Sequence, residues 1–267
     1  MYDTRLGIIG AGNMASAILN GVLEKRIFPV DDIIVSNRSE SKLETWKEKG
    51  IQVTTDNLKV VLESDVIILA VKPQSMEEVI KNIGLAAEGK CVVSIAAGVS
   101  REYLRDRLGP DVFLVRAMPN MPLLAGYGAT AITYPYGTPD PLFQAVVSIF
   151  DASGTTVLMH EKTMNEIIAV NGSSPAYFFR MANAMVNWAK EQGIDPESAL
   201  TLTAKSMEGA SKLLLSGDKT LKEWIDQVCS PGGTTLAALS AFDEMEFDGM
   251  IAEAMNRCTK RANELGQ

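Results

Sequence analysis

The stretch LGIIGAGNMASAIL, residues 6–19, decides how the first half of this chain folds. A short apolar run, a glycine-rich turn and an amphipathic segment follow one another, which predicts a strand, a turn and a helix. In the pattern Gly10-x-Gly12-x-x-Ala15, Gly10 allows a tight turn, Gly12 lets a pyrophosphate approach the backbone, and Ala15 lets helix and strand pack closely. Because a helix N-terminus offers free N–H groups, the turn predicts a dinucleotide-binding loop.

The same alternation continues to about residue 160. Short β-rich runs are separated, in the first part, by helix-length amphipathic segments, an order that favours parallel strands with helical crossovers. The runs are LGIIG, IIVSN, QVTT, VIILAV, CVVSIA, VFLVRAM, GATAITY and TTVLM. We therefore expect residues 1–160 to form an α/β domain of the Rossmann type, with a doubly wound, mostly parallel sheet.

The second half has a helical period instead. Apolar residues recur at steps of three and four, for example at Phe178, Met181, Met185 and Trp188. The pattern predicts an all-helical domain over residues 161–267. Several of its helix faces are apolar without an obvious partner in so small a domain, which favours a homodimer with interlocking helices; burial inside one chain is the alternative.

Composition excludes several classes of protein. The net charge is −8 and no lysine or arginine run is present, so nucleic acid is not expected as a partner. The three cysteines and the single histidine, His160, follow no metal-ligand spacing, and no apolar run reaches the length of a membrane span. We expect a cytoplasmic protein that uses no metal and does not enter a membrane.

The end of the second predicted strand indicates which dinucleotide is bound. An acidic residue there would bind the ribose 2′-hydroxyl of NAD, but the sequence has Ser36, Asn37 and Arg38 instead. Arg38 can neutralise a 2′-phosphate, and the two polar neighbours can hydrogen-bond it. NADPH is therefore the expected cofactor and NADH a weaker one, unless Arg38 is simply a solvated loop residue.

Two further loops follow predicted strands, LAVKPQ at residues 69–74 and IAAGVS at residues 95–100. Ligands of open α/β sheets bind beyond the carboxyl ends of the strands, so these loops are placed to line the nicotinamide end of the groove. Taken alone, a loop of this kind is more often ordinary loop chemistry than a cofactor contact, and Lys72 is then a solvated lysine.

The stretch SPGGTTLAAL, residues 230–239, is the best candidate for the substrate site. The helical half offers no positioned acid or base for an alcohol, whereas a C=N bond needs mainly positioning for hydride transfer. Gly232, Gly233 and Thr234 expose N–H groups suited to a small carboxylate, and Thr234 or Thr235 can place a hydroxyl beside an imine nitrogen. Ordinary helix N-caps at Ser230 and the threonines are the alternative.

Together these motifs resemble the pyrroline-5-carboxylate reductases, which reduce 1-pyrroline-5-carboxylate to L-proline with NAD(P)H. The resemblance covers essentially the whole chain and is carried by GIIGAGNMA, AVKP, AAGV, RAMPNMP, SSPAYFF and VCSPGGTT. It implies an oxidoreductase of proline biosynthesis with a Rossmann domain and a helical dimerisation domain. Enzymes of this family dimerise and often assemble further into rings of dimers, and the resemblance implies a small imino acid as the substrate.

The resemblance implies a set of site residues. The cofactor contacts fall on Ile9, Gly10, Ala11, Gly12, Asn13, Met14, Ser36, Asn37, Arg38, Asn57, Ala70, Val71, Lys72, Pro73, Ile95, Ala96 and Ala97. The substrate contacts fall on Ser230, Gly232, Gly233, Thr234 and Thr235. Thr235 is the predicted catalytic residue, which holds the ring nitrogen, and Met118 and Asn120 are predicted to face the nicotinamide.

The segment NGSSPAY departs from the pattern that the family usually shows. Asn171 stands in place of a serine and Ser174 in place of a glycine. The change leaves open a related cyclic imino acid as substrate. A β-hydroxyacid dehydrogenase is a second alternative, disfavoured because residues 171–180 lack a lysine, and a catalytically silent NADP-binding regulator is a third.

Overall fold

The structure is a computed structural model that describes residues 2, 4–134 and 140–266. Two compact units are present: Met1–Pro175 together with Arg257–Gln267, and Ala176–Asn256. Two helices, α8 (Ser174–Glu191) and α12 (Phe247–Leu265), run from one unit into the other. The predicted domain boundary at residue 160 stays a prediction, and the compact units follow a different division.

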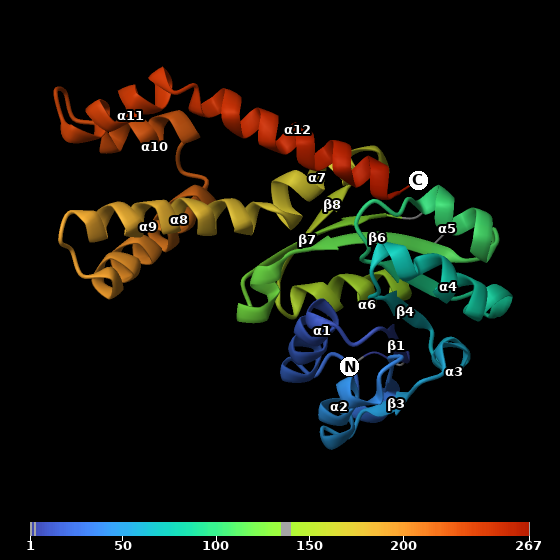
Figure 1. Cartoon of the computed structure of the whole chain (residues 1–267). Helices are drawn as coiled ribbons and strands as arrows, with labels where there is room; N and C mark the ends of the chain where they lie inside the picture. The colour runs from blue at the N-terminus through green and yellow to red at the C-terminus, as the bar shows by residue number, and fades with distance from the viewer. Residues whose placement is uncertain (1, 3, 135–139, 267) are drawn as a thin grey trace. The chain divides into compact units, whose positions relative to one another are not determined.

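The first unit is built on one eight-stranded sheet with the order β3-β2-β1-β4-β5-β6-β7-β8 (Figure 1). Only the β6–β7 pair is antiparallel among the strand pairs of the described residues. The strands are β1 (Leu6–Ile9), β2 (Ile33–Ser36), β3 (Gln52–Thr54), β4 (Val66–Leu69), β5 (Cys91–Ser94), β6 (Phe113–Pro119), β7 (Gly128–Thr133) and β8 (Gly154–Met159). Each coincides with one of the eight predicted β-rich runs, with β6 and β8 extending one residue beyond theirs, so the mostly parallel sheet is confirmed.

Helices cover both faces of this sheet, as a doubly wound fold requires. One face packs against α1 (Asn13–Glu24), α2 (Glu44–Glu48) and α6 (Asp140–Asp151), and the other against α3 (Asn57–Leu62), α4 (Pro73–Ile83) and α5 (Arg101–Leu108). Successive strand residues supply the two cores in turn: Ile68 belongs to the first and Ile67 to the second. Cys91 lies in this interior, where burial raises the pKa of its thiol to about 12 and keeps it neutral.

Short helical turns connect these elements. They comprise η1 (Val30–Asp32), η2 (Glu40–Lys42), η3 (Gly84–Ala87), η4 (Met121–Ala125), η5 (Glu161–Thr163), α7 (Met164–Ile167) and the π-helical segment η6 (Ile168–Gly172). Segments α7 and η6 belong to the first unit and pack against β6 and β7. The first residues of the predicted helical half, in α7 and η6, therefore belong to the sheet unit.

The second unit is entirely helical. Besides most of α8 and the first half of α12, it contains α9 (Pro196–Ser216), α10 (Leu221–Val228) and α11 (Thr234–Glu244). Local signals fix where these helices begin: Asp195 caps α9 by accepting from the Ser198 N–H, and Thr220 and Glu223 form a capping box at the start of α10. The helical character expected for this part of the chain is confirmed.

Two negative observations apply to the described residues. Among them, no helix combines the length and the apolar character that a bilayer crossing demands. Nor do three or more His, Cys, Asp or Glu side chains gather there in an arrangement suited to a metal ion.

Candidate active site

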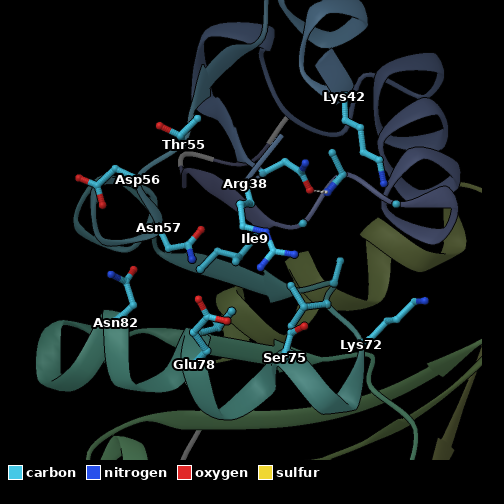
Figure 2. A pocket seen from close by; sticks show the side chains of 17 residues that line it. Ile9, Arg38, Lys42, Thr55, Asp56, Asn57, Lys72, Ser75, Glu78 and Asn82 are labelled. Carbon is cyan, nitrogen blue, oxygen red and sulfur yellow. Dashed lines mark hydrogen bonds between the residues drawn. The ribbon is translucent and has the colours of Figure 1, made fainter. Parts of the chain in front are cut away.

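A pocket of about 570 Å³ opens at the carboxyl ends of β1, β2 and β4 (Figure 2). Parallel strands that leave a sheet at the same edge create such a crevice, and this is where α/β folds bind ligands. Ten residues predicted from the sequence line it: Ile9, Gly10, Ala11, Gly12, Asn37, Arg38, Asn57, Ala70, Val71 and Lys72. The structure thus brings together four predicted parts of the sequence: residues 9–12, 37–38, 57 and 70–72.

The two glycines of the first turn are required for different reasons. Gly10 has φ +105°, and a Cβ there would lie 2.5 Å from the Ala70 carbonyl oxygen, so both conformation and packing demand glycine. At Gly12 an added Cβ would meet no protein atom within 4 Å. The protein itself does not need glycine at this position, and the open space faces the pocket, as expected for a backbone that a phosphate approaches.

Two of the polar side chains at the end of β2 are hydrogen-bonded within the protein, which the sequence does not show. Ser36 is fully buried and donates its hydroxyl to Asn57 Oδ1 at 2.7 Å. Asn37 Oδ1 accepts the N–H of Ala11 at 3.2 Å, so Asn37 supports the glycine-rich turn. Arg38, in contrast, is exposed and lines the pocket. Of the three predicted 2′-phosphate ligands, Ser36 is outside the pocket because its side chain is engaged beneath it.

Seven lining residues were missed by the sequence analysis: Lys42, Thr55, Asp56, Ser75, Glu78, Val79 and Asn82. Four of them recur at three- and four-residue steps on α4, directly after Lys72, so helical periodicity would have found them. Lys42 follows Arg38 by four residues through the turn η2. It adds a third cation to Arg38 and Lys72, against two carboxylates, those of Asp56 and Glu78 (Figure 2).

The remaining predicted cofactor residues do not line this pocket. Asn13, Met14 and Pro73 occupy first turns of helices, with Met14 packed against the core. Ile95, Ala96 and Ala97 follow β5 and contact three different apolar clusters. The N–H of Ile95 is bound to the Leu69 carbonyl oxygen and that of Ala96 to Ser94 Oγ, each at 3.3 Å. Backbone carbonyl groups, rather than these N–H groups or the side chains, are what residues 95 and 96 can offer a ligand.

The predicted substrate turn lies in the second unit, between α10 and α11. Gly232 has φ +67°, and the N–H of Gly233 is bound to the Ser230 carbonyl oxygen at 2.9 Å. Gly233 is the N-cap of α11 and makes no side-chain cap hydrogen bond. The alternative of ordinary serine or threonine N-caps is therefore wrong here.

Free donors remain at the start of α11. The first N–H that reaches back to the N-cap is that of Ala237, which approaches the Gly233 carbonyl oxygen at 3.4 Å. The N–H groups of Thr234, Thr235 and Leu236 precede it, in the positions that have no acceptor inside a helix. The N–H of Gly233, which was expected to bind a carboxylate, is already used by the turn itself.

Asn120 and Asn171 form a hydrogen-bonded pair in the first unit. Asn120 donates to Asn171 Oδ1 at 2.9 Å and accepts the Ala129 N–H at 2.9 Å. Asn171 Nδ2 donates to the carbonyl oxygens of Met118 (2.7 Å) and Ala129 (3.0 Å). Met118 itself packs in an apolar cluster. Both side chains are thus engaged with other parts of the protein, and the expectation that Asn120 and Met118 face the nicotinamide stays a prediction.

A glycine-rich βα turn, a cationic pocket at the carboxyl edge of a doubly wound sheet and a separate helical unit define a dinucleotide-dependent oxidoreductase. Family models agree with this class. Residues 161–265 match the model described as pyrroline-5-carboxylate reductase dimerisation, and residues 5–98 match the model described as NADP oxidoreductase, coenzyme F420-dependent.

Whole-chain relatives are more specific. A pyrroline-5-carboxylate reductase of Methanosarcina acetivorans is 37% identical over 270 aligned positions that cover 100% of both chains. The solved structure of a pyrroline-5-carboxylate reductase from Coxiella burnetii superposes with a TM-score of 0.90 at 32% identity, covering 99% of both chains. The Plasmodium falciparum pyrroline carboxylate reductase, solved with NADP bound, gives a TM-score of 0.91 at 24% identity over 100% of both chains, which shows the shared fold. The chain belongs to the pyrroline-5-carboxylate reductase family.

Proposed function

We propose that this protein reduces 1-pyrroline-5-carboxylate to L-proline by hydride transfer from NADPH, the last step of proline biosynthesis. The observation that carries the proposal is full-length similarity to reductases of this name together with the intact turn at residues 230–235. The contacts of Asn171 support this substrate. Asn171 departs from the family pattern, but its side chain is hydrogen-bonded to Asn120 and to two backbone carbonyl oxygens, so the departure does not indicate a different substrate.

The pocket at the carboxyl edge fits NADPH. Gly12 leaves room for the pyrophosphate, the N-terminus of α1 adds positive potential, and Arg38 and Lys42 supply cations for the 2′-phosphate. Ser36 contributes indirectly, by holding Asn57 at the pocket wall. When bound, NADPH supplies the hydride; this chain's residues orient it.

The start of α11 fits a small imino acid. The substrate carboxylate binds the N–H groups of Thr234 and Thr235, with Ser230, Gly232 and Gly233 shaping the approach. The Thr235 hydroxyl donates a hydrogen bond to the ring nitrogen. The hydride pair forms the new C–H bond at the imine carbon, the π pair of the C=N bond goes to nitrogen, and that nitrogen carries a proton from solution or through Thr235.

The test is an NADPH oxidation assay with purified protein. It uses 1-pyrroline-5-carboxylate, the isomeric 1-pyrroline-2-carboxylate and the corresponding six-membered imine, with L-proline identified as the product. We expect the first substrate to have the highest kcat/KM. An equal or higher value for either other imine would contradict the substrate assignment, and turnover of a hydroxyacid alone would contradict imine reduction.

The cofactor preference tests the roles of Arg38 and Lys42. We expect Arg38→Gln to raise the KM for NADPH by about tenfold and Lys42→Gln by severalfold, while the KM for NADH changes little, since only NADPH carries the 2′-phosphate. Lys47→Gln is the control, because Lys47 is an exposed lysine of α2 outside the pocket. Parallel changes for both cofactors would refute 2′-phosphate binding by these side chains.

The second unit is proposed to form a homodimer through its helices, and the dimers to assemble into rings. The exposed apolar side chains of this unit and the dimerisation family model support the dimer. The protein is proposed to act in the cytoplasm, where its free cysteines remain reduced.

A further inference from the structure

The loop at residues 95–100 is in close contact with the C-terminal end of α12. Gly98 has φ +79°, and a Cβ on it would overlap the Ala262 carbonyl oxygen and lie 3.1 Å from the Gly266 nitrogen. In the other direction, a Cβ on Gly266 would overlap the Gly98 carbonyl oxygen. Two backbones approach each other here at a distance that only glycine permits.

Apolar packing joins the same two segments. Ala262 is buried in one cluster with Met118, Met164 and Ile168, and Ala97 packs against this cluster. Ala97 belongs to the loop that is proposed to contact the cofactor. The end of α12 is therefore a wall against which this loop rests.

A polar network fixes the end of α12 from the other side. Asn165 Nδ2 donates to Asn263 Oδ1 at 2.6 Å, and the Asn165 Oδ1 accepts from Arg116 at 2.8 Å. Arg116, only 4% exposed, also donates to Glu161 Oε1 at 2.7 Å. Because leaving a buried guanidinium unpaired is costly, Arg116 keeps Asn165 and Glu161 in place.

The network also reaches the far end of the loop. Glu161 Oε1 accepts the N–H of Arg101 at 3.2 Å, and Arg101 is the first residue of α5, directly after the loop. Both the interior and the exit of the 95–100 loop are thus tied to the segment that holds α12. These contacts add to those that Ile95, Ala96 and Val99 make with the sheet core.

We propose that residues 257–266, the last turns of α12, position the 95–98 loop for cofactor binding, with Gly98 and Gly266 as the positioning residues. The inference rests on the proposed function in one respect, that this loop contacts NADPH. Helix α12 begins in the helical unit, and its last turns contact the loop.

The first test compares Gly98→Ala with Gly89→Ala in the full-length protein. Both glycines have positive φ, so alanine strains both backbones, but a Cβ on Gly89 meets nothing within 4 Å. We expect Gly98→Ala to raise the KM and the dissociation constant for NADPH roughly 10- to 100-fold and to lower kcat, with the KM for the imine little changed. Gly89→Ala keeps wild-type kinetics.

The second test uses Gly266→Ala, which presses on the same contact from the end of the chain and keeps the proposal testable if Gly98→Ala does not fold. We expect the same rise in KM for NADPH. A folded Gly266→Ala with NADPH affinity within about twofold of wild type overturns the positioning role. A wild-type protein that neither binds NADPH in titration nor oxidises it overturns the proposed function instead, and this inference with it.

Discussion

Glycine at position 12 is expected to be required for ligand binding and not for folding. Its neighbour Gly10 is required by its own backbone, whereas Gly12 borders open space in the pocket. We expect Gly12→Ala to leave the free energy of unfolding within about 1 kcal/mol of wild type, because no protein atom is displaced. The KM for NADPH should rise at least tenfold, because the new methyl group occupies the approach of the pyrophosphate.

Gly10→Ala is the contrasting variant for this experiment. It should destabilise the protein in chemical denaturation even without cofactor, through a positive φ and the contact with the Ala70 carbonyl oxygen. If Gly12→Ala binds NADPH normally, the pyrophosphate does not approach that backbone.

Thr235 tests the chemistry of the substrate turn. It is a half-buried residue in the first turn of α11, whose N-cap bond is not made by its hydroxyl. We expect Thr235→Ala to lower kcat by about 10²- to 10³-fold while the dissociation constant for NADPH stays within twofold, because only the imine loses a hydrogen bond. Thr235→Ser keeps the hydroxyl and should retain most of the activity; equal losses in both variants would speak against the hydroxyl.

The role of a residue was predictable where only one residue type can fulfil that role at its position. The glycine pattern identified Gly10 and Gly12, and the absence of an acidic residue after β2 directed attention to Arg38. The sequence does not reveal which polar side chain points where, so Ser36 was taken for a phosphate ligand although it is buried against Asn57. Lys42 was missed because a lysine in a turn carries no signal of its own.

At the scale of elements, the strands were predictable because buried parallel strands are continuous apolar runs. VIILAV, for instance, contains β4, whose four residues are all buried. The π-helical segment η6 was not predictable, because its extra residue per turn depends on the tertiary hydrogen bonds of Asn171. It was equally unpredictable that the last residues of α12 belong to the sheet unit, since helical periodicity does not say what a helix face contacts.

The hydrogen bonds of Asn171 lead to a prediction about stability and specificity. Asn171→Ala leaves two carbonyl oxygens and the Asn120 amide without their partner, which should lower the free energy of unfolding by roughly 2–4 kcal/mol. The ratio of kcat/KM values between the five- and six-membered imines should stay within about twofold of wild type. Asn171→Ser is the conservative control; a change in that ratio would restore Asn171 as a determinant of substrate choice.

For the whole molecule, the two units differ in how they are stabilised. The sheet unit has three apolar clusters, whereas among residues 176–256, all of them described, only Ala189, Ala199 and Thr203 are buried. Apolar side chains such as Met185 and Leu202 are 47% and 67% exposed in the single chain. We therefore expect a unit with so little interior to gain stability by burying these faces against a second copy.

Association and stability should therefore be coupled. We expect the midpoint of thermal unfolding to rise with protein concentration, because dimerisation adds free energy only to the folded state. Met185→Glu combined with Leu202→Glu should raise the dimer dissociation constant at least tenfold, measured by sedimentation, since each carboxylate would have to be desolvated in an apolar interface. The matched control is Leu62→Glu with Leu85→Glu, two leucines of the sheet unit with exposed fractions of 62% and 71%. An equal effect of both pairs, or a midpoint independent of concentration, would show that the helical unit is stable without a partner and that its apolar faces serve another purpose.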